Sequence, residues 1–351
     1  MTPKRLIVVV IALALLIAGY GAYWMHLANG LETATLDWIA ARRADGYAID
    51  HGEVSRGGFP DDVRIAIDGI RIAPPLPSDW AWEVERAAVG TSPFRPDRVR
   101  IAVGGHQELH LVVSGMPRTY AGTAVEEQAE LKRGGWLPVG TVTVRDLVLV
   151  DDVSGDRIAV ATGDLVTAGD PAAPSGPGTA GYEVRFGASG LYVPGEWPLM
   201  LGGGVDVVLL RASLMGALKE KPWPETLARW RDAGGTVEVA RIDFQQGNFR
   251  MAGEGTFALD GDGQPIGAMT SRLSGWQPIL AAFARRGLIN KETATTVTMV
   301  LNGFAKNDAD GVPVLSVPIR LQDRLLSAGP MPVVRLPRVD WLDGAAPPRE
   351  R

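Results

Sequence analysis

The chain has 351 residues and a formal net charge of −5, with 43 glycines, 25 prolines and no cysteine. A cysteine-free sequence excludes disulfides, thiolate nucleophiles and cysteine-ligated zinc. The charge is acidic and spread along the chain, so we expect no nucleic-acid partner. The length allows two domains or one elongated β domain. The many glycine, proline, valine, isoleucine and threonine residues are typical of short strands joined by tight turns.

An uncharged apolar run from Leu6 to Trp24 opens the chain. At about 1.5 Å of helix rise per residue it reaches about 30 Å, the thickness of a bilayer's hydrocarbon core. Lys4 and Arg5 precede the run, which predicts a cytoplasmic N-terminus. The far end carries three aromatic residues that we expect at the membrane interface: Tyr20, Tyr23 and Trp24. Residues 1–30 are therefore predicted to be a single-pass anchor in the inner membrane, with the remaining body in the periplasm.

A cleaved signal peptide is the alternative interpretation of this run. Gly19 and Gly21 are small residues at a spacing that a signal peptidase accepts. The apolar run is longer than the 7–15 residues typical of the apolar region of a signal peptide, which favours a retained anchor.

The apolar pattern changes after residue 46 from helical to alternating. A helix is predicted from about Gly30 to Ala44, followed by half-buried strands in which every second residue is apolar. Two such strand faces stand out, one made by Val63, Ile65 and Ile67 and the other by Val99, Ile101 and Val103. We expect these two faces to line an open groove. The alternative is that they form a closed core.

The rest of the chain is predicted to continue as strands with a few short helices. Helices are expected at 124–132, 212–219, 224–232 and 277–288, and strands at 139–150, 182–186, 205–210, 236–244, 248–259, 267–273, 295–301 and 317–321. The low-complexity segment 169–181 predicts a flexible loop between a first β-rich half (31–168) and a second (182–340). A disordered tail is expected at 341–351.

The predicted fold class is mainly β with a few short helices (α+β), a transmembrane helix followed by twisted antiparallel sheets. The sheets form either a half-open groove or an elongated sandwich. Segments 38–46 and 230–235 both end a helix with Asp and Gly and lead into strands, which suggests a twofold repeat of helix plus β-meander.

Groups that invite a catalytic or metal-binding interpretation are better explained structurally. His106, Glu108 and His110 alternate on a predicted strand, but a third histidine is missing nearby, so a solvated strand face is favoured and no metal is expected. The acidic pairs at 151–152 and 260–262 lie beside glycines at predicted turns, where aspartate is favoured for local hydrogen bonding. We therefore expect no catalytic residues, no cofactor and no enzymatic activity.

Three segments, together with the N-terminal anchor, resemble a known family. They are Gly46-Tyr47 through Gly57-Gly58-Phe59-Pro60, Gly253-Glu254-Gly255 through Gly267, and Val317-Pro318-Ile319 through Pro332. The chain resembles the bacterial domain-of-unknown-function family 2125, which looks related to the AsmA-like envelope proteins. One departure is Arg324 after Asp323, where this closing motif more usually has glycine. The resemblance implies a membrane-anchored, periplasmic β-rich body associated with envelope lipid homeostasis or lipid transport, and it implies no catalytic residue.

The leading functional hypothesis is a non-enzymatic, membrane-anchored protein that binds lipid or contributes to envelope lipid homeostasis. Its expected partners are the inner membrane, lipid and envelope proteins. The residues expected to line the lipid groove are Val63, Ile65, Ile67, Val99, Ile101 and Val103. The alternative is a structural or interaction module that scaffolds envelope partners without binding lipid. An exported hydrolase is a third hypothesis, and it is disfavoured because no nucleophile–base grouping is visible.

Overall fold

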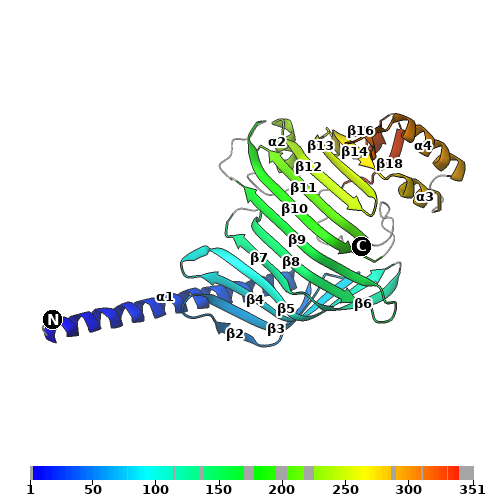
Figure 1. The fold of residues 1–351 in the computed structure, drawn as a ribbon. Coiled ribbons are helices and arrows are strands. Elements are labelled where there is room, and N and C mark those ends of the chain that lie inside the picture. Colours follow the sequence, from blue (N-terminus) through cyan, green and yellow to red (C-terminus); the bar gives the residue numbers. More distant parts are fainter. Residues whose placement is uncertain are drawn as a thin grey trace, which may run out of the picture. The chain divides into compact units, whose positions relative to one another are not determined.

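The structure is a computed structural model, and it shows a mainly β chain with one long N-terminal helix, antiparallel strands and a few short helices (Figure 1). It describes residues 3–76, 78–113, 115–134, 137–169, 178–194, 204–216, 225–285, 290–309, 311–329 and 331–339. The chain divides into two compact units, which we describe separately: unit 1 is Met1–Arg133 with Val142–Ile158, and unit 2 is Gly134–Thr141 with Ala159–Arg351.

Helix α1 (Pro3–Ala44) is continuous, with no break at Gly30. It is the one helix in the described part of the chain that is long and apolar enough to cross a membrane, a criterion that a signal sequence near an N-terminus also meets. Its first half projects away from the strands of unit 1 (Figure 1). Six large apolar side chains of this half are 54–70% exposed: Ile7, Ile11, Leu13, Leu15, Leu16 and Ile17. Its second half packs against those strands.

Unit 1 is an antiparallel sheet built on two long central strands. Its strands are β1 (Ala48–Asp50), β2 (Val54–Gly57), β3 (Val63–Ala73), β4 (Trp80–Ser92), β5 (Arg95–Val113), β6 (Met116–Thr123), β7 (Glu126–Lys132) and β8 (Val139–Val150), of which 142–150 belong to this unit. Both β1 and β2 pair with β3, which pairs with β4, which pairs with β5. The predicted alternation at 63–69 is thereby confirmed as a strand with one buried face.

The core of unit 1 lies between α1 and the buried face of β3. Val63 and Ile65 are 0% exposed, and they pack against Trp24, Ala28 and Leu31 of α1. Near the C-terminal end of α1, Ile39 packs into a second cluster that includes Ile49, Ile67, Ile70 and Val84. Three apolar residues of α1 at 24, 28 and 31 follow the 3.6-residue helical period, so one stripe of the helix covers the sheet.

The segment predicted as a helix at 124–132 is strand β7, so this prediction was wrong. Its sequence is rich in helix-forming Glu, Ala, Gln and Lys. The long strand β5 explains the difference, because its second half pairs with β6 and its first half pairs with β7. Cross-strand pairing therefore overrides the local helix propensity of β7.

Unit 2 continues with antiparallel strands that lie side by side in chain order, as the green and yellow strands of Figure 1 show. Its elements are β9 (Arg157–Gly169), β10 (Ala180–Tyr192), β11 (Gly204–Met215), α2 (Glu225–Asp232), β12 (Thr236–Gln246), β13 (Phe249–Leu259), β14 (Pro265–Ser274), α3 (Gln277–Arg285), α4 (Lys291–Phe304), β15 (Lys306–Asn307), β16 (Pro313–Gln322), β17 (Leu325–Ala328) and β18 (Met331–Arg335).

Helix α2 confirms the helix predicted at 224–232, and it is fixed by one tryptophan. Trp230 is 6% exposed, and its indole Nε1 donates a hydrogen bond of 2.7 Å to the carbonyl of Met215. A Cβ atom at Gly235 would collide with the Trp230 ring, so glycine at the end of this helix is required for close packing. The helix predicted at 212–219 was wrong in its described part, since residues 212–215 are the end of β11.

A strand predicted at 295–301 is instead part of helix α4. Its Thr- and Val-rich sequence favours a strand by composition. Within the helix, two threonine hydroxyls donate hydrogen bonds to the carbonyls four residues earlier. Thr295 donates to Lys291 at 3.0 Å, and Thr298 donates to Ala294 at 2.8 Å. Val297, Val300, Leu301 and Phe304 also follow the helical period, a signal that outweighs composition.

Residues 170–177 of the predicted loop at 169–181 and the whole of the predicted tail at 341–351 lie outside the described residues. At the turn between β16 and β17, Asp323 and Arg324 both have positive φ, at 49° and 62°. Such angles explain why glycine is favoured at the second of these positions.

Candidate functional site

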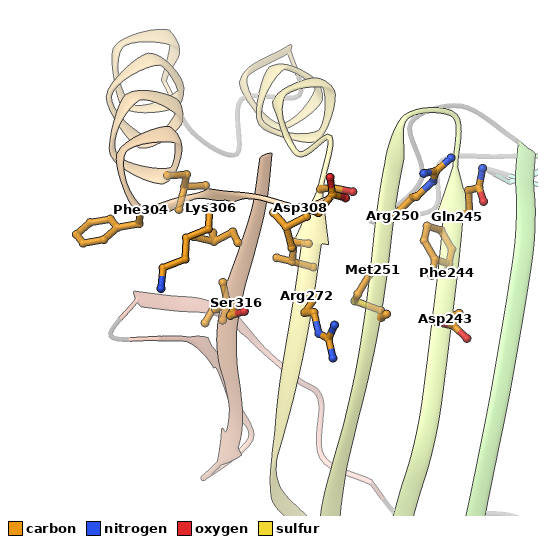
Figure 2. Close-up of a pocket in the computed structure, with 18 of the residues that line it drawn as sticks. Asp243, Phe244, Gln245, Arg250, Met251, Arg272, Phe304, Lys306, Asp308 and Ser316 are labelled. Carbon is orange, nitrogen blue, oxygen red and sulfur yellow. The ribbon is translucent and has the colours of Figure 1, made fainter. Parts of the chain in front are cut away.

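A large cavity lies in unit 2, over the strands β11 to β14 and β16 and beside helix α4. Its volume is about 1180 Å³, which exceeds the ~300–1,000 Å³ of ordinary small-molecule pockets. Figure 2 shows Phe304 and Lys306 on the α4 side of the cavity and Arg250, Gln245 and Phe244 over the strands opposite.

Two cross-strand rows form the floor of this cavity. The register places Leu209, Asp243, Ala252, Arg272 and Ser316 in one row across five adjacent strands. The neighbouring row on the same face contains Val207, Gln245, Arg250, Ser274 and Val314. Alternate residues of a strand point to the same side, and all ten of these residues line the cavity.

Apolar surface dominates the walls. The apolar lining comes from strands and from one helix: Val207, Leu209, Phe244, Met251, Ala252, Leu273, Val300, Leu301, Phe304, Val314, Leu315, Val317 and Pro318. Val300 and Phe304 of α4 remain 50% and 73% exposed. An exposed phenylalanine beside an apolar cavity is surface that another apolar group can cover.

Three cations line the same cavity: Arg250, Arg272 and Lys306. Arg250 pairs with Ser274, two positions from Arg272, so the two arginines are diagonal neighbours, whose Cα atoms are about 7–8 Å apart. Among the described residues these three cations have no carboxylate within ion-pair distance, whereas Arg241 of the same lining is paired with Asp243. Two carboxylates, Asp243 and Asp308, line the cavity together with these three cations and Arg241, so its charge is net positive. Apolar walls with a net positive charge suit an amphiphile with an anionic head group.

The six predicted groove residues belong to unit 1, and none of them lines this cavity. Val63, Ile65 and Ile67 are at most 2% exposed, because α1 and neighbouring strands cover them, so for these three the closed-core alternative holds. On β5, Val103 packs on the second core cluster, Val99 is half-buried and Ile101 is 37% exposed.

Sequence reasoning missed the residues that line the unit 2 cavity. The β strands of both units show the same apolar alternation, so periodicity alone does not reveal which face a helix covers. The helical spacing of residues 297–304 was the available signal, since it predicts an apolar helix face beside the strand at 313–322.

The predicted interface residues Tyr20, Tyr23 and Trp24 all contact turns of unit 1. Tyr20 donates its hydroxyl hydrogen to the carbonyl of Pro60 at 2.5 Å, and Tyr23 does so to Pro93 at 3.0 Å. The indole Nε1 of Trp24 donates to the carbonyl of Asp62 at 2.7 Å. These contacts fix one face of α1 immediately after its exposed apolar half.

The His106–His110 segment forms a small polar cluster on strands β4 and β5. The Nε2 atom of His110 lies 3.4 Å from a carboxylate oxygen of Glu83 and 3.9 Å from one of Glu108. His110 Nδ1 also lies 2.9 Å from the Thr119 hydroxyl. These three acid–base groups lie close enough to hold a metal ion, but each is partly exposed, and such clusters also occur on solvated strand faces.

One carboxylate of each predicted acidic pair, Asp151 of 151–152 and Asp260 of 260–262, makes hydrogen bonds within a turn. Asp260 accepts hydrogen bonds from the backbone N–H groups of residues 262 and 264, at 2.9 and 2.8 Å. Asp151 accepts from the Ser154 hydroxyl at 2.6 Å, from the Val153 N–H at 3.1 Å and from the Arg118 guanidinium at 3.1 Å. Both are consistent with the local hydrogen bonding that aspartate makes in turns.

We expect Asp151→Asn to lower the thermal midpoint of unit 1 at pH 7. The Ser154 hydroxyl, with the Val153 amide and Arg118, holds the pKa of the Asp151 carboxyl below its ordinary value. A depressed folded-state pKa stabilises the fold above the unfolded-state pKa of about 3.9, and this stabilisation is lost as the pH falls through the folded-state pKa. The difference between variant and wild type should therefore shrink below about pH 4.

The neighbouring variant Asp152→Asn is the matched control, because Asp152 is exposed. Thermal melts at pH 3, 5 and 7 compare the three proteins. Equal midpoints for D151N and wild type at pH 7 would contradict the assignment.

Comparison with protein families gives one match. The family described as "Uncharacterized protein conserved in bacteria (DUF2125)" matches residues 24–337. No curated protein and no solved structure matches the chain. The matched region begins at Trp24, where α1 starts to pack on unit 1, and ends in the segment after β18. Because the match covers most of the sequence, the chain belongs to the DUF2125 family.

Proposed function

We propose that this protein is a non-enzymatic, membrane-anchored lipid-binding protein whose unit 2 cavity takes the acyl chains of an anionic phospholipid. The cavity carries this proposal, with its volume of about 1180 Å³, its apolar walls and its three unpaired cations. Acyl chains would cover the apolar lining, including the exposed Phe304, and gain about 25 cal/mol for each Å² removed from water.

The head group would lie near the arginines. Arg250 and Arg272, as diagonal neighbours, present two guanidinium groups on one face, and guanidinium binds phosphate with two parallel hydrogen bonds. The proposal keeps the lipid-binding groove of the sequence-based hypothesis but assigns it to residues of unit 2 instead of the six residues of unit 1.

The proposal includes retention of α1 as an inner-membrane anchor with the body in the periplasm. Lys4 and Arg5 before the apolar run support a cytoplasmic N-terminus. Cleavage after Gly21 would cut a continuous helix between Tyr20 and Trp24, both of which are hydrogen-bonded to unit 1. These contacts favour a retained helix over a signal peptide.

Native mass spectrometry of the full chain, purified in mild detergent and mixed with lipids of known mass, tests the function. We expect one phosphatidylglycerol to be retained per chain, in preference to phosphatidylcholine with the same acyl chains, because the latter is zwitterionic. Retention of neither lipid would refute lipid binding and would favour the alternative, a module that scaffolds envelope proteins.

A further inference from the structure

Two turns of unit 1 lie beside α1 where its exposed apolar half ends. They are residues 58–62, between β2 and β3, and residues 93–94, between β4 and β5. Each turn carries an exposed phenylalanine, Phe59 at 58% and Phe94 at 73%. Tyr20 lies against both rings, with centroid distances of 6.2 Å to Phe59 and 6.3 Å to Phe94.

The length of α1 fixes the depth of this contact. Tyr20 follows Arg5 by 15 residues of continuous helix, a rise of about 22 Å, whereas the hydrocarbon core is about 30 Å thick. If Arg5 lies at the cytoplasmic surface, Tyr20 does not reach beyond the opposite surface. The two phenylalanines that contact Tyr20 then lie at the same depth.

The hydrogen bonding of the turns also fits a membrane interface. A backbone carbonyl that leaves water without a partner costs free energy. Here the carbonyls of Pro60, Asp62 and Pro93 accept from the side chains of Tyr20, Trp24 and Tyr23. Pro60 and Pro93 themselves have no N–H group to satisfy, so these turns present few unpaired polar backbone groups.

Charged side chains of both signs lie next to these turns. Arg95 directly follows Phe94 and is exposed, and it lines a small polar pocket together with Arg98, Arg100, Asp61, Asp62 and Glu130. Arg98 is paired with Glu130 and Arg100 with Asp62, while Arg95 has no ion pair among the residues that the structure describes. A free guanidinium one residue from an inserted aromatic ring suits the level of the lipid phosphates.

From these observations we propose that turns 58–62 and 93–94 insert Phe59 and Phe94 into the interfacial region of the periplasmic leaflet, beside α1. Unit 1 thus binds the membrane through three elements rather than through one helix. The inference rests on the proposal that α1 remains in the membrane, and it is independent of the unit 2 cavity.

The lack of cysteine in the chain makes a direct test possible. Single-cysteine variants Phe59→Cys and Phe94→Cys are labelled with the fluorophore NBD and reconstituted in vesicles of phosphatidylethanolamine and phosphatidylglycerol. Lipids carrying a nitroxide on the head group, high on the acyl chain or deep on the acyl chain serve as quenchers. We expect a blue-shifted emission and strong quenching at both positions.

Leu76→Cys is the matched control, because Leu76 is 90% exposed in the connection at the opposite end of β3 and β4. Leu13→Cys, in the apolar half of α1, reports separately whether the helix lies in the bilayer. Quenching of the Phe59 and Phe94 probes no stronger than that of the Leu76 probe overturns the inference. If the Leu13 probe is quenched by deep nitroxides in that case, α1 spans the membrane but the two turns do not insert. If the Leu13 probe is not quenched either, the proposal that α1 is a membrane anchor is also refuted.

The two loop variants are independent of each other. Phe94 is the more exposed of the two, and the ring contact found for it is with Tyr20 alone, so its replacement leaves the fold of unit 1 intact even if the Phe59 variant is destabilised.

Discussion

Replacement of Ile65 by aspartate should unfold unit 1. The Ile65 side chain is 0% exposed between β3 and α1. Burying an unpaired carboxylate there costs several kcal/mol, and loss of the packed side chain adds about 2–5 kcal/mol. These costs together approach the roughly 5–15 kcal/mol by which a whole domain is stable.

Limited proteolysis followed by mass spectrometry measures this effect separately for each unit. The matched control is Ile101→Asp, the same chemical change on β5 at a side chain that is 37% exposed. We expect rapid cleavage throughout unit 1 for I65D and a wild-type pattern for I101D. Wild-type protection of I65D would mean that α1 does not cover this strand face.

The double variant Arg250→Ala with Arg272→Ala should weaken phosphatidylglycerol binding by about 100-fold. A hydrogen bond to a charged group contributes about 1.5–3 kcal/mol. Two such contacts at the lower value amount to about 3 kcal/mol, and each 1.4 kcal/mol corresponds to a tenfold change in Kd. Both side chains lie on the solvent-exposed face of their strands, so their removal leaves the fold unchanged.

The double variant Arg211→Ala with Arg320→Ala is the control, because it removes two exposed arginines of unit 2 that do not line the cavity. Lipid titrations followed by native mass spectrometry give the affinities. Binding of phosphatidylcholine should change less than that of phosphatidylglycerol. An equal loss in both double variants would show a general charge effect and would remove the cavity as the head-group site.

The fold class was predictable from the sequence because alternation and turn composition are local signals. The strand predicted at 63–69 and the helix predicted at 224–232 appear as β3 and α2. Three elements were wrong: the helix predicted at 124–132, the described part of the helix predicted at 212–219, and the strand predicted at 295–301. The first is decided by pairing with a distant part of the chain, whereas the last follows a helical period that outweighs its β-forming composition. Strand β7 is held by pairing with β5, and α4 satisfies its threonine hydroxyls on its own carbonyls.

The cavity was less predictable than the fold. The alternating faces at 63–67 in unit 1 and at 207–209 in unit 2 look alike in sequence, but the former is covered by α1 and the latter lines a cavity. Arg250 and Arg272 are 22 positions apart and become neighbours only through the β13–β14 register. Knowledge of that register, which depends on the turn at 260–263, is needed to bring them together.

The packing of α1 on β3 has a consequence for any division of this protein into an anchor and a soluble domain. Trp24 and Ala28 are 8% and 0% exposed in the core of unit 1, so a boundary at residue 30 passes through that core. A truncated protein starting at residue 31 would expose Val63 and Ile65 to water. Experiments on it would therefore report on a unit 1 that lacks part of its core, not on an intact soluble domain. The apolar helix α1 and the strands of unit 1 therefore fold as one unit.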